Sequence, residues 1–129
     1  MYFSPLDLRS VIPIVQWVRA EGVVAVVTCI EQYDEGGILR LRLDGVRTDE
    51  DTFVTWPSGT IEIDGEEIGS TVCGESALAD TLSLDIGFRP WLPTSAREIA
   101  VRIDGVRGAQ GELAEPIVVA VRIPRPGDK

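Results

Sequence analysis

Hydrophobic and polar residues alternate along most of this chain with a period of two, which is typical of β-strands buried on one face. Four segments show this alternation: residues 39–43, 60–64, 81–88 and 98–103. Residues 23–30 and 117–121 are apolar on both faces, which suits central strands or a covered edge. A further strand is expected over residues 11–19, with Pro13 at a sheet edge or a bulge.

Polar turns rich in glycine, proline and aspartate separate these seven strand candidates. The longest segment without a strand pattern, around residues 76–80, is expected to hold one short helical turn. Seven short strands with short connections predict an all-β, antiparallel, immunoglobulin-like β-sandwich of about seven strands.

Two of the turns carry nearly identical hexapeptides, RLDGVR at residues 42–47 and RIDGVR at residues 102–107, and IDG recurs at residues 63–65. Aspartate tolerates the left-handed region and glycine readily adopts a positive φ, so an Asp-Gly pair suits the end of a strand. We therefore interpret the hexapeptides as repeated strand terminators rather than as a ligand site. This interpretation also predicts that Arg42 and Arg102 lie on one outer face, on neighbouring strands.

One longer segment carries a recognisable combination of features: residues 22–43, GVVAVVTCIEQYDEGGILRLRL, contain a glycine, alternating valines, a Glu-x-Tyr pair, an Asp/Gly turn and an alternating Leu/Arg strand. The matching positions are Gly22, Val24, Val26, Glu31, Tyr33, Gly37, Leu39, Leu41, Arg42 and Leu43. Together with WLPTSAREIAVRI at residues 91–103, this pattern resembles that of uncharacterised bacterial, actinobacterial-type, immunoglobulin-like β-sandwich proteins. A D-L-G-T-x-Y element common in that group is not present, and residues 61–70 stand in its place. The resemblance implies the fold and no activity.

The chain has 129 residues, which fits a single domain over residues 1–129. We expect residues 1–10 to form an N-terminal extension and residues 124–129 to form a flexible tail. Hydrophobic residues make up 44% of the chain, enough to build a core. No stretch approaches the ~20 apolar residues of a membrane span, and the N-terminal segment lacks the pattern of a signal peptide. We therefore predict a cytoplasmic location and no membrane partner.

The composition excludes several kinds of chemistry. The chain has no histidine, which removes Ser-His-Asp and Cys-His sites and histidine metal centres, and it has no glycine-rich phosphate loop. Its net charge of −9 repels phosphate, so no nucleic-acid partner is predicted. We predict no cofactor and no enzyme activity, with catalysis by carboxylates alone as the remaining enzymatic alternative. The two cysteines, Cys29 and Cys73, are expected to be reduced, with Cys29 acting as a small core residue.

Acidic loop residues and tryptophans supply the other candidates. Asp49, Glu50 and Asp51 are weak candidate ligands for Ca²⁺, which prefers several oxygen atoms, although their spacing does not match an EF-hand loop. A calcium-binding or small-molecule-binding sandwich is therefore the alternative function. Trp17 is interpreted as a core residue, and Trp56 and Trp91 as caps on the ends of the sandwich.

The sharpest functional hypothesis concerns one sheet face. An immunoglobulin-like layout would place residues 38–44 beside 98–104, and these beside 116–123. The outward side chains would then form an interaction face of Arg40, Arg42, Ala100, Arg102, Val118, Ala120 and Arg122. Arginines beside small apolar residues are typical of protein–protein interfaces, so we predict a non-catalytic interaction or assembly module that binds a protein partner or self-associates. The competing interpretation is a solvated strand face with charge pairs, such as Glu98 with an arginine.

Overall fold

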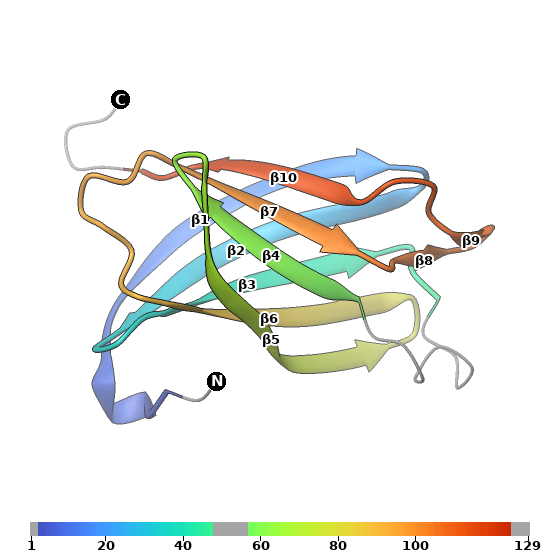
Figure 1. Ribbon diagram of the computed structural model, residues 1–129. Helices are drawn as coiled ribbons and strands as arrows, with labels where there is room; N and C mark the ends of the chain where they lie inside the picture. The colour runs from blue at the N-terminus through green and yellow to red at the C-terminus, as the bar shows by residue number, and fades with distance from the viewer. Residues whose placement is uncertain (1–2, 48–56, 125–129) are drawn as a thin grey trace.

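The computed structural model describes residues 3–47 and 57–124, which form an all-β protein of antiparallel strands (Figure 1). Eight strands of this part of the chain form one sheet: β1 (Leu8–Ala20), β2 (Val23–Tyr33), β3 (Gly37–Asp44), β4 (Ser58–Ile63), β5 (Glu66–Leu78), β6 (Thr81–Arg89), β7 (Glu98–Asp104) and β10 (Ile117–Arg122). The other elements are a 3-10 turn, η1 (Pro5–Asp7), and a small hairpin of β8 (Arg107–Gly108) and β9 (Gly111–Glu112).

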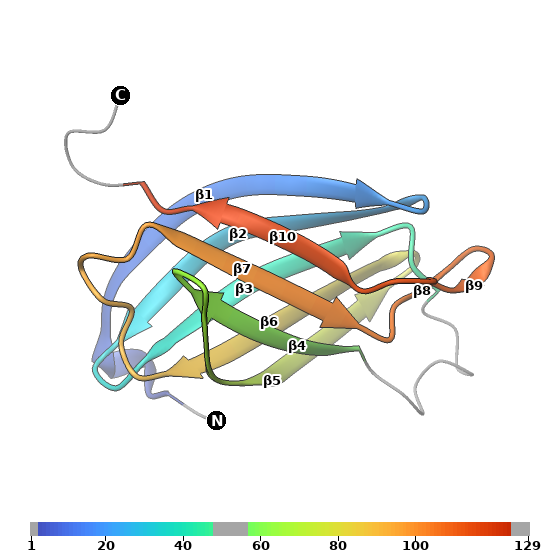
Figure 2. The ribbon, with the colours of Figure 1, turned by 45° about the horizontal axis from the view of Figure 1, so that its top comes forward.

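The sheet has the strand order β1-β2-β3-β6-β5-β4-β7-β10 and curls until its two ends face one another. Strand β5 makes this curvature possible because it is thirteen residues long and serves both halves of the sheet. Its first residues pair with β4, and the segment from Gly69 to Leu78 pairs with β6. Strands β4, β7 and β10 therefore lie in front of β2, β3 and β6, as Figure 2 shows. The result is a nearly closed, barrel-like sheet.

The prediction of an all-β antiparallel fold is confirmed, whereas the immunoglobulin-like arrangement of about seven strands is not. All seven strand candidates are strands, but the helical turn expected at residues 76–80 is wrong, since β5 continues to Leu78. Strand β5 lacks a regular apolar alternation and contains Gly69 and Gly74, which is why its sequence pattern is weak.

The core lies between the two layers and is built by the alternating positions of the predicted strands. Leu39, Leu41 and Leu43 of β3 are all buried, and Phe88 of β6 is the largest fully buried side chain. Inward-facing isoleucines and valines of β4, β7 and β10 complete the core from the other side. Alternation therefore places the apolar half of each strand inside and leaves the polar half as the outer surface.

The Asp-Gly pairs end strands, as the sequence predicts. Strand β3 ends at Asp44 and β7 at Asp104, and Asp64 begins the turn between β4 and β5. The glycines that follow have φ values of 87°, 77° and 89° for Gly45, Gly105 and Gly65. These values lie in the left-handed region, where a side chain would be strained.

Candidate functional site

The predicted arginine face is divided between two sides of the barrel. Strand β3, with Arg40 and Arg42, pairs with β2 and β6 and not with β7. Strand β7, with Arg102, pairs with β4 and β10. The expected pairing of residues 98–104 with 116–123 is confirmed, but the expected pairing of 38–44 with 98–104 is wrong. Arg42 and Arg102 therefore do not share a face on neighbouring strands.

Each hexapeptide also neutralises its own arginine. Arg42 forms an ion pair with Asp44 at 3.3 Å, and Arg102 forms one with Asp104 at the same distance. Residues two apart in a strand lie on the same face, so the R-x-D spacing brings the two charges together. The Thr81 hydroxyl and Arg42 both donate hydrogen bonds to the Asp44 carboxylate, and together they lower its pKa.

Arg40 is the centre of a larger charge network on the outer face of β2, β3 and β6. Its guanidinium lies 2.9 Å from Glu31 on one side and 2.9 Å from Asp85 on the other. The Tyr33 hydroxyl donates to Glu31 at 2.8 Å, which extends the network towards the end of the barrel. Arg40 thus links three neighbouring strands, and two carboxylates already pair with its guanidinium.

The network changes the titration of its members. Burial raises the pKa of Tyr33 to about 12, and the hydrogen bond to Glu31 and the negative charges nearby add to this effect. Burial alone would raise the pKa of Glu31, but the hydrogen bonds from Arg40 and Tyr33 outweigh it, and the pKa is lowered. The pKa of Arg40 is raised, mainly by its hydrogen bond to Glu31. This charge network therefore has a structural role, because it joins β2, β3 and β6.

The remaining residues of the predicted face lie on β7 and β10. Here Ala100 is opposite Ala120, and Arg102 is opposite Val118. Ala100, Arg102 and Val118 line a shallow hollow of about 410 Å³ on the outside of the barrel, together with Thr60, Glu62, Glu67 and Asp104. Glu62 and Glu67 are exposed on this surface, so their carboxylates are solvated.

The two ends of the sheet meet at a seam that a side chain closes. Among the described residues no backbone ladder joins β1 to β10. Instead, the Gln16 side-chain amide donates to the Arg122 carbonyl oxygen at 3.0 Å and accepts from the Arg122 backbone N–H at 3.1 Å. The amide thus reproduces the pair of hydrogen bonds that a strand neighbour would make.

Gln16 follows an irregularity in β1. The register against β2 shifts between Pro13 and Gln16, and Val15 has a φ of 53°. A β-branched residue adopts this conformation only under strain, so the backbone is strained at the bulge that precedes Gln16. The bulge and Pro13 also make β1 a poor template for strand addition.

Exposed apolar side chains gather on the outer face of β1, next to the seam. Val11, Val15 and Trp17 are 51%, 68% and 62% exposed. The interpretation of Trp17 as a core residue is therefore wrong: from Ile12 onward, even-numbered residues of β1 face inward and odd-numbered ones face out. In the sequence, Pro13 was the signal that this strand lies at a sheet edge. Because the strand has apolar residues on both faces, its pattern did not show which face is buried.

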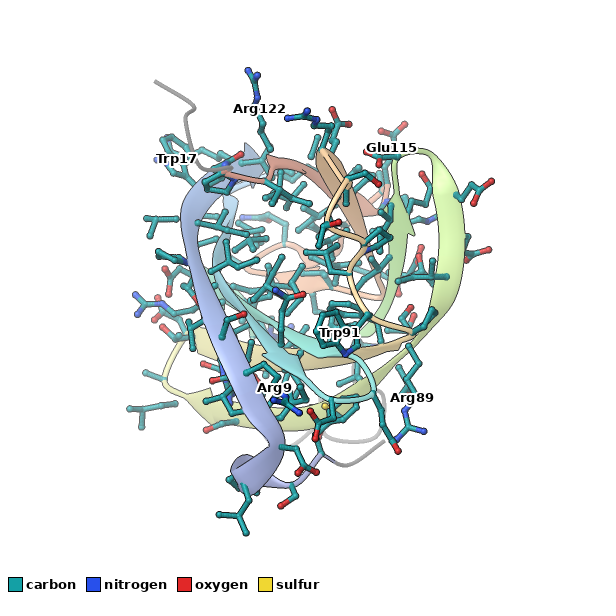
Figure 3. The ribbon with its side chains drawn as sticks, turned by 90° about the vertical axis from the view of Figure 1, so that its left-hand side faces the viewer. Arg9, Trp17, Arg89, Trp91, Glu115 and Arg122 are labelled. Carbon is teal, nitrogen blue, oxygen red and sulfur yellow. The ribbon has the colours of Figure 1, made fainter. Side chains whose placement is uncertain are left out.

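Two arginines accompany this strip. Arg19 lies two residues beyond Trp17 on the same face of β1, and Arg122 lies across the seam on β10. Figure 3 shows the Trp17 and Arg122 side chains at the seam, both directed away from the core. Within residues 3–47 and 57–124, neither the Arg19 nor the Arg122 guanidinium forms an ion pair. We call Val11, Val15, Trp17, Arg19 and Arg122 the seam patch.

A second concave surface lies at the end of the barrel, where β6 leads to β7. It has a volume of about 530 Å³ and is lined by Ile63, Asp64, Glu66, Ile68, Pro90 and Trp91, among others. We call it the Trp91 cleft. The indole N–H of Trp91 donates to the carbonyl oxygen of Asp34 at 2.5 Å. Trp91 therefore lies at the barrel end, as expected, but it is 42% exposed and forms a wall rather than a closed cap.

The other sequence candidates contribute less to a site. Cys29 and Cys73 are both half-buried free thiols, so the prediction of Cys29 as a core residue is wrong: it lies opposite Arg40, outside the core cluster. Burial raises the pKa of Cys73, with the Asp85 charge adding to the effect. Asp49, Glu50, Asp51 and Trp56 lie outside the described residues. Within the described residues, no group of three histidine, cysteine or acidic side chains is placed to hold a metal ion. The same residues include no helix of sufficient length and hydrophobicity to cross a membrane.

Comparison with known proteins supports the fold and adds no activity. No family model and no curated protein matches the chain. Among solved structures, it is similar to the conserved domain protein from Bacillus anthracis, with a TM-score of 0.55 and 14% sequence identity. The match covers 88% of this chain and 47% of that protein, so this chain spans about half of its length. At this identity the similarity shows the fold alone, an antiparallel all-β arrangement.

Proposed function

We propose that this protein is a non-catalytic interaction module that docks an acidic protein partner on the seam patch. The observation that carries the proposal is the exposure of Val11, Val15 and Trp17 on one face of one strand. Contiguous exposed apolar residues of this kind mark interaction sites on soluble proteins. Tryptophan and arginine are the residue types that most often dominate the binding energy of an interface.

Charge complementarity selects the partner. The chain carries a net charge of −9, yet Arg19 and Arg122 of the seam patch form no ion pair among the described residues, although Glu98 lies opposite Arg122 on β7. An acidic protein surface would pair with both arginines while Trp17 enters an apolar pocket. A two-fold contact between copies would bring the same arginines together, which disfavours self-association through this patch.

The seam patch replaces most of the arginine face that the sequence predicts. Arg40, Arg42 and Arg102 already have carboxylate partners, whereas Arg122 is retained in the new surface. The immunoglobulin-like relationship, the cytoplasmic location and the calcium alternative remain predictions. None of them is needed for a docking surface on β1 and β10.

Capture with variants tests the proposal. Full-length protein is used to recover partners, which are identified by mass spectrometry, purified and measured by calorimetry. We expect Trp17→Ala to weaken binding of the relevant partner at least about tenfold, because central tryptophans are often hot spots. Arg19→Glu with Arg122→Glu should weaken it further at low salt. Leu78→Ala, which removes an exposed leucine on β5, is the matched control and should bind normally.

Two results would contradict the proposal. In the first, partners bind Trp17→Ala and the wild-type protein equally, while Arg40→Glu or Arg102→Glu abolishes binding. In the second, sedimentation velocity shows a dimer that Trp17→Ala disperses, which would assign the patch to a second copy of the chain.

A further inference from the structure

The Trp91 cleft is separate from the seam patch and has its own chemistry. Figure 3 shows Trp91 and Trp17 well apart on this side of the barrel; Trp17 lies on β1, and Trp91 lies in the connection between β6 and β7. A volume of about 530 Å³ lies within the range of sites that hold a small ligand or a few residues of a peptide. The seam patch, by comparison, is an outward-facing strip.

Apolar side chains and prolines form most of the wall of the cleft, with Ser95 as a polar member of the lining. The hydrogen bond to Asp34 holds the Trp91 indole in place, so one of its faces can serve as a fixed platform. Pro90 beside it has no N–H group, and Ile63 and Ile68 form further apolar lining. A ligand packs on such walls at least cost when it presents apolar rings and no backbone N–H donors, as a proline-rich chain does; in the polyproline II conformation its carbonyl oxygens stay solvated.

The rim of the cleft is acidic. Asp64 accepts hydrogen bonds from the backbone N–H groups of Arg97 and Glu98 through one carboxylate oxygen, at 3.1 and 3.0 Å, which fixes its position. Glu66 is exposed and forms no ion pair among the described residues. Two carboxylates beside an apolar wall complement a cation carried on an apolar stem, such as an arginine or lysine side chain.

We propose that the Trp91 cleft binds an extended, proline-rich peptide in which a basic residue follows the prolines. The prolines would pack on Trp91 and Pro90 in the polyproline II conformation, which is preformed and therefore loses little entropy on binding. The basic side chain would pair with Glu66 and Asp64. This inference is independent of the seam patch and assigns a second, different ligand to the molecule.

A titration with defined peptides tests the inference on the full chain. The probe is a blocked peptide of sequence PPPRPPR, and the control peptide has glutamates in place of the arginines. Binding is followed through the indole N–H signals in ¹H–¹⁵N spectra, with Trp91 assigned by the Trp91→Phe variant. We expect the arginine peptide to shift the Trp91 signal and leave the Trp17 signal in place, whereas the glutamate peptide should shift neither.

Two neighbouring glutamates provide matched variants. Glu66 lines the Trp91 cleft, whereas Glu67 lines the hollow on the outer face, because consecutive strand residues point in opposite directions. Glu66→Gln should weaken the arginine peptide about twofold to fivefold, as expected for an exposed charge pair, and Glu67→Gln should not. Trp91→Ala lacks the reporting indole, so its binding is measured by calorimetry; we expect the arginine peptide to bind at least about tenfold more weakly while far-ultraviolet circular dichroism stays unchanged.

Several outcomes would overturn this inference. They are an unshifted Trp91 signal at millimolar peptide, equal binding of the two peptides, and equal weakening by Glu66→Gln and Glu67→Gln. Trp17→Ala should leave peptide binding unchanged, so failure of this inference and failure of the seam-patch proposal are separate results.

Discussion

The outer face of β3 and the seam between β1 and β10 both present arginine side chains at outward positions, yet the arginines of the two regions have different surroundings. At β3, Arg40 lies between Glu31 and Asp85, and its charge is consumed inside the molecule. At the seam, Arg19 and Arg122 have no such partners in the described chain and stand beside exposed apolar side chains. The comparison shows that the strands on either side decide what an arginine does.

Topology explains the difference. Strand β3 is central and has β2 and β6 as neighbours, and each neighbour supplies a carboxylate to Arg40. Strands β1 and β10 are the two ends of the sheet, and the Gln16 side chain is what bridges them. The central strand β3 therefore completes a charge network around Arg40, whereas Arg19 of β1 and Arg122 of β10 form no ion pair among the described residues.

The largest expected effect comes from removing the centre of the network. Arg40→Ala would leave Glu31 partly buried without its counterion, and we expect a loss of about 1–3 kcal/mol in the free energy of unfolding. Solvent screening of this half-exposed group favours the lower end of that range. Urea denaturation measures the change.

The control for this prediction is Arg42→Ala, which removes an arginine of the same strand and face. Arg42 is more exposed and pairs with Asp44 in a single local contact. Its loss should cost less than about 1 kcal/mol, the usual value of a surface ion pair. Equal losses in the two variants would show that the Arg40 network adds no more stability than a surface ion pair, and the contrast with the seam would then fail.

A smaller effect is expected at the seam itself. Gln16→Ala removes both hydrogen bonds to Arg122, and because these bonds are exposed we expect a loss of about 1 kcal/mol. The Arg122 amide should also exchange its hydrogen much faster, which NMR detects at a single residue. Gln32→Ala, which removes an exposed bond to Ser10, should change stability by less than about 0.5 kcal/mol and leave the Arg122 amide protected. Continued protection in Gln16→Ala would show that something other than this side chain closes the barrel.

Much of the local structure was predictable because it depends on local patterns. Alternation identified strands such as β3 and β6 within a few residues of their ends, and Asp-Gly identified where β3 and β7 end. The R-x-D spacing also contained the Arg42–Asp44 and Arg102–Asp104 pairs, although only the geometry made them evident. These features depend on residues close together in the chain.

The long-range arrangement was not predictable, and one strand explains why. The sequence pattern did not identify β5, and the seven strands that it did identify suggested two separate sheets with β3 beside β7. With β5 present, the two halves join into a single sheet, and β4 and β6 take the places beside β7 and β3. Irregular polar strands with glycines carry little pattern, so the element that determines the topology has the weakest signal.

The exposure of Trp17 was missed for a related reason. Strand β1 is apolar on both faces, and such a strand suits a covered position as well as an uncovered one. The outer face of β1 is open because the strands form one curled sheet, whose outer surface no other sheet covers in the part of the chain that the structure describes. The candidate site therefore emerges from the topology and not from a motif.

The smallest effect at neutral pH concerns Tyr33, where the network reaches the end of the barrel. Tyr33→Phe removes one hydrogen bond to Glu31, worth about 1 kcal/mol or less. Its larger signature lies at high pH. Because the folded-state pKa is about 12 and the unfolded value is about 10, Tyr33 stabilises the fold fully below pH 10, and this contribution is lost as the pH rises towards 12. Wild-type stability should therefore fall more steeply over this range than that of Tyr33→Phe.

Spectrophotometric titration separates the causes of this shift. The chain has two tyrosines, so Tyr2→Phe leaves the absorbance of the Tyr33 phenolate alone. Glu31→Gln should lower the midpoint, but it should stay above 10 because burial is the larger cause. A midpoint near 10 in the folded Tyr2→Phe protein would contradict the buried network. It would also remove the contrast between a closed charge cluster at β3 and an open one at the seam.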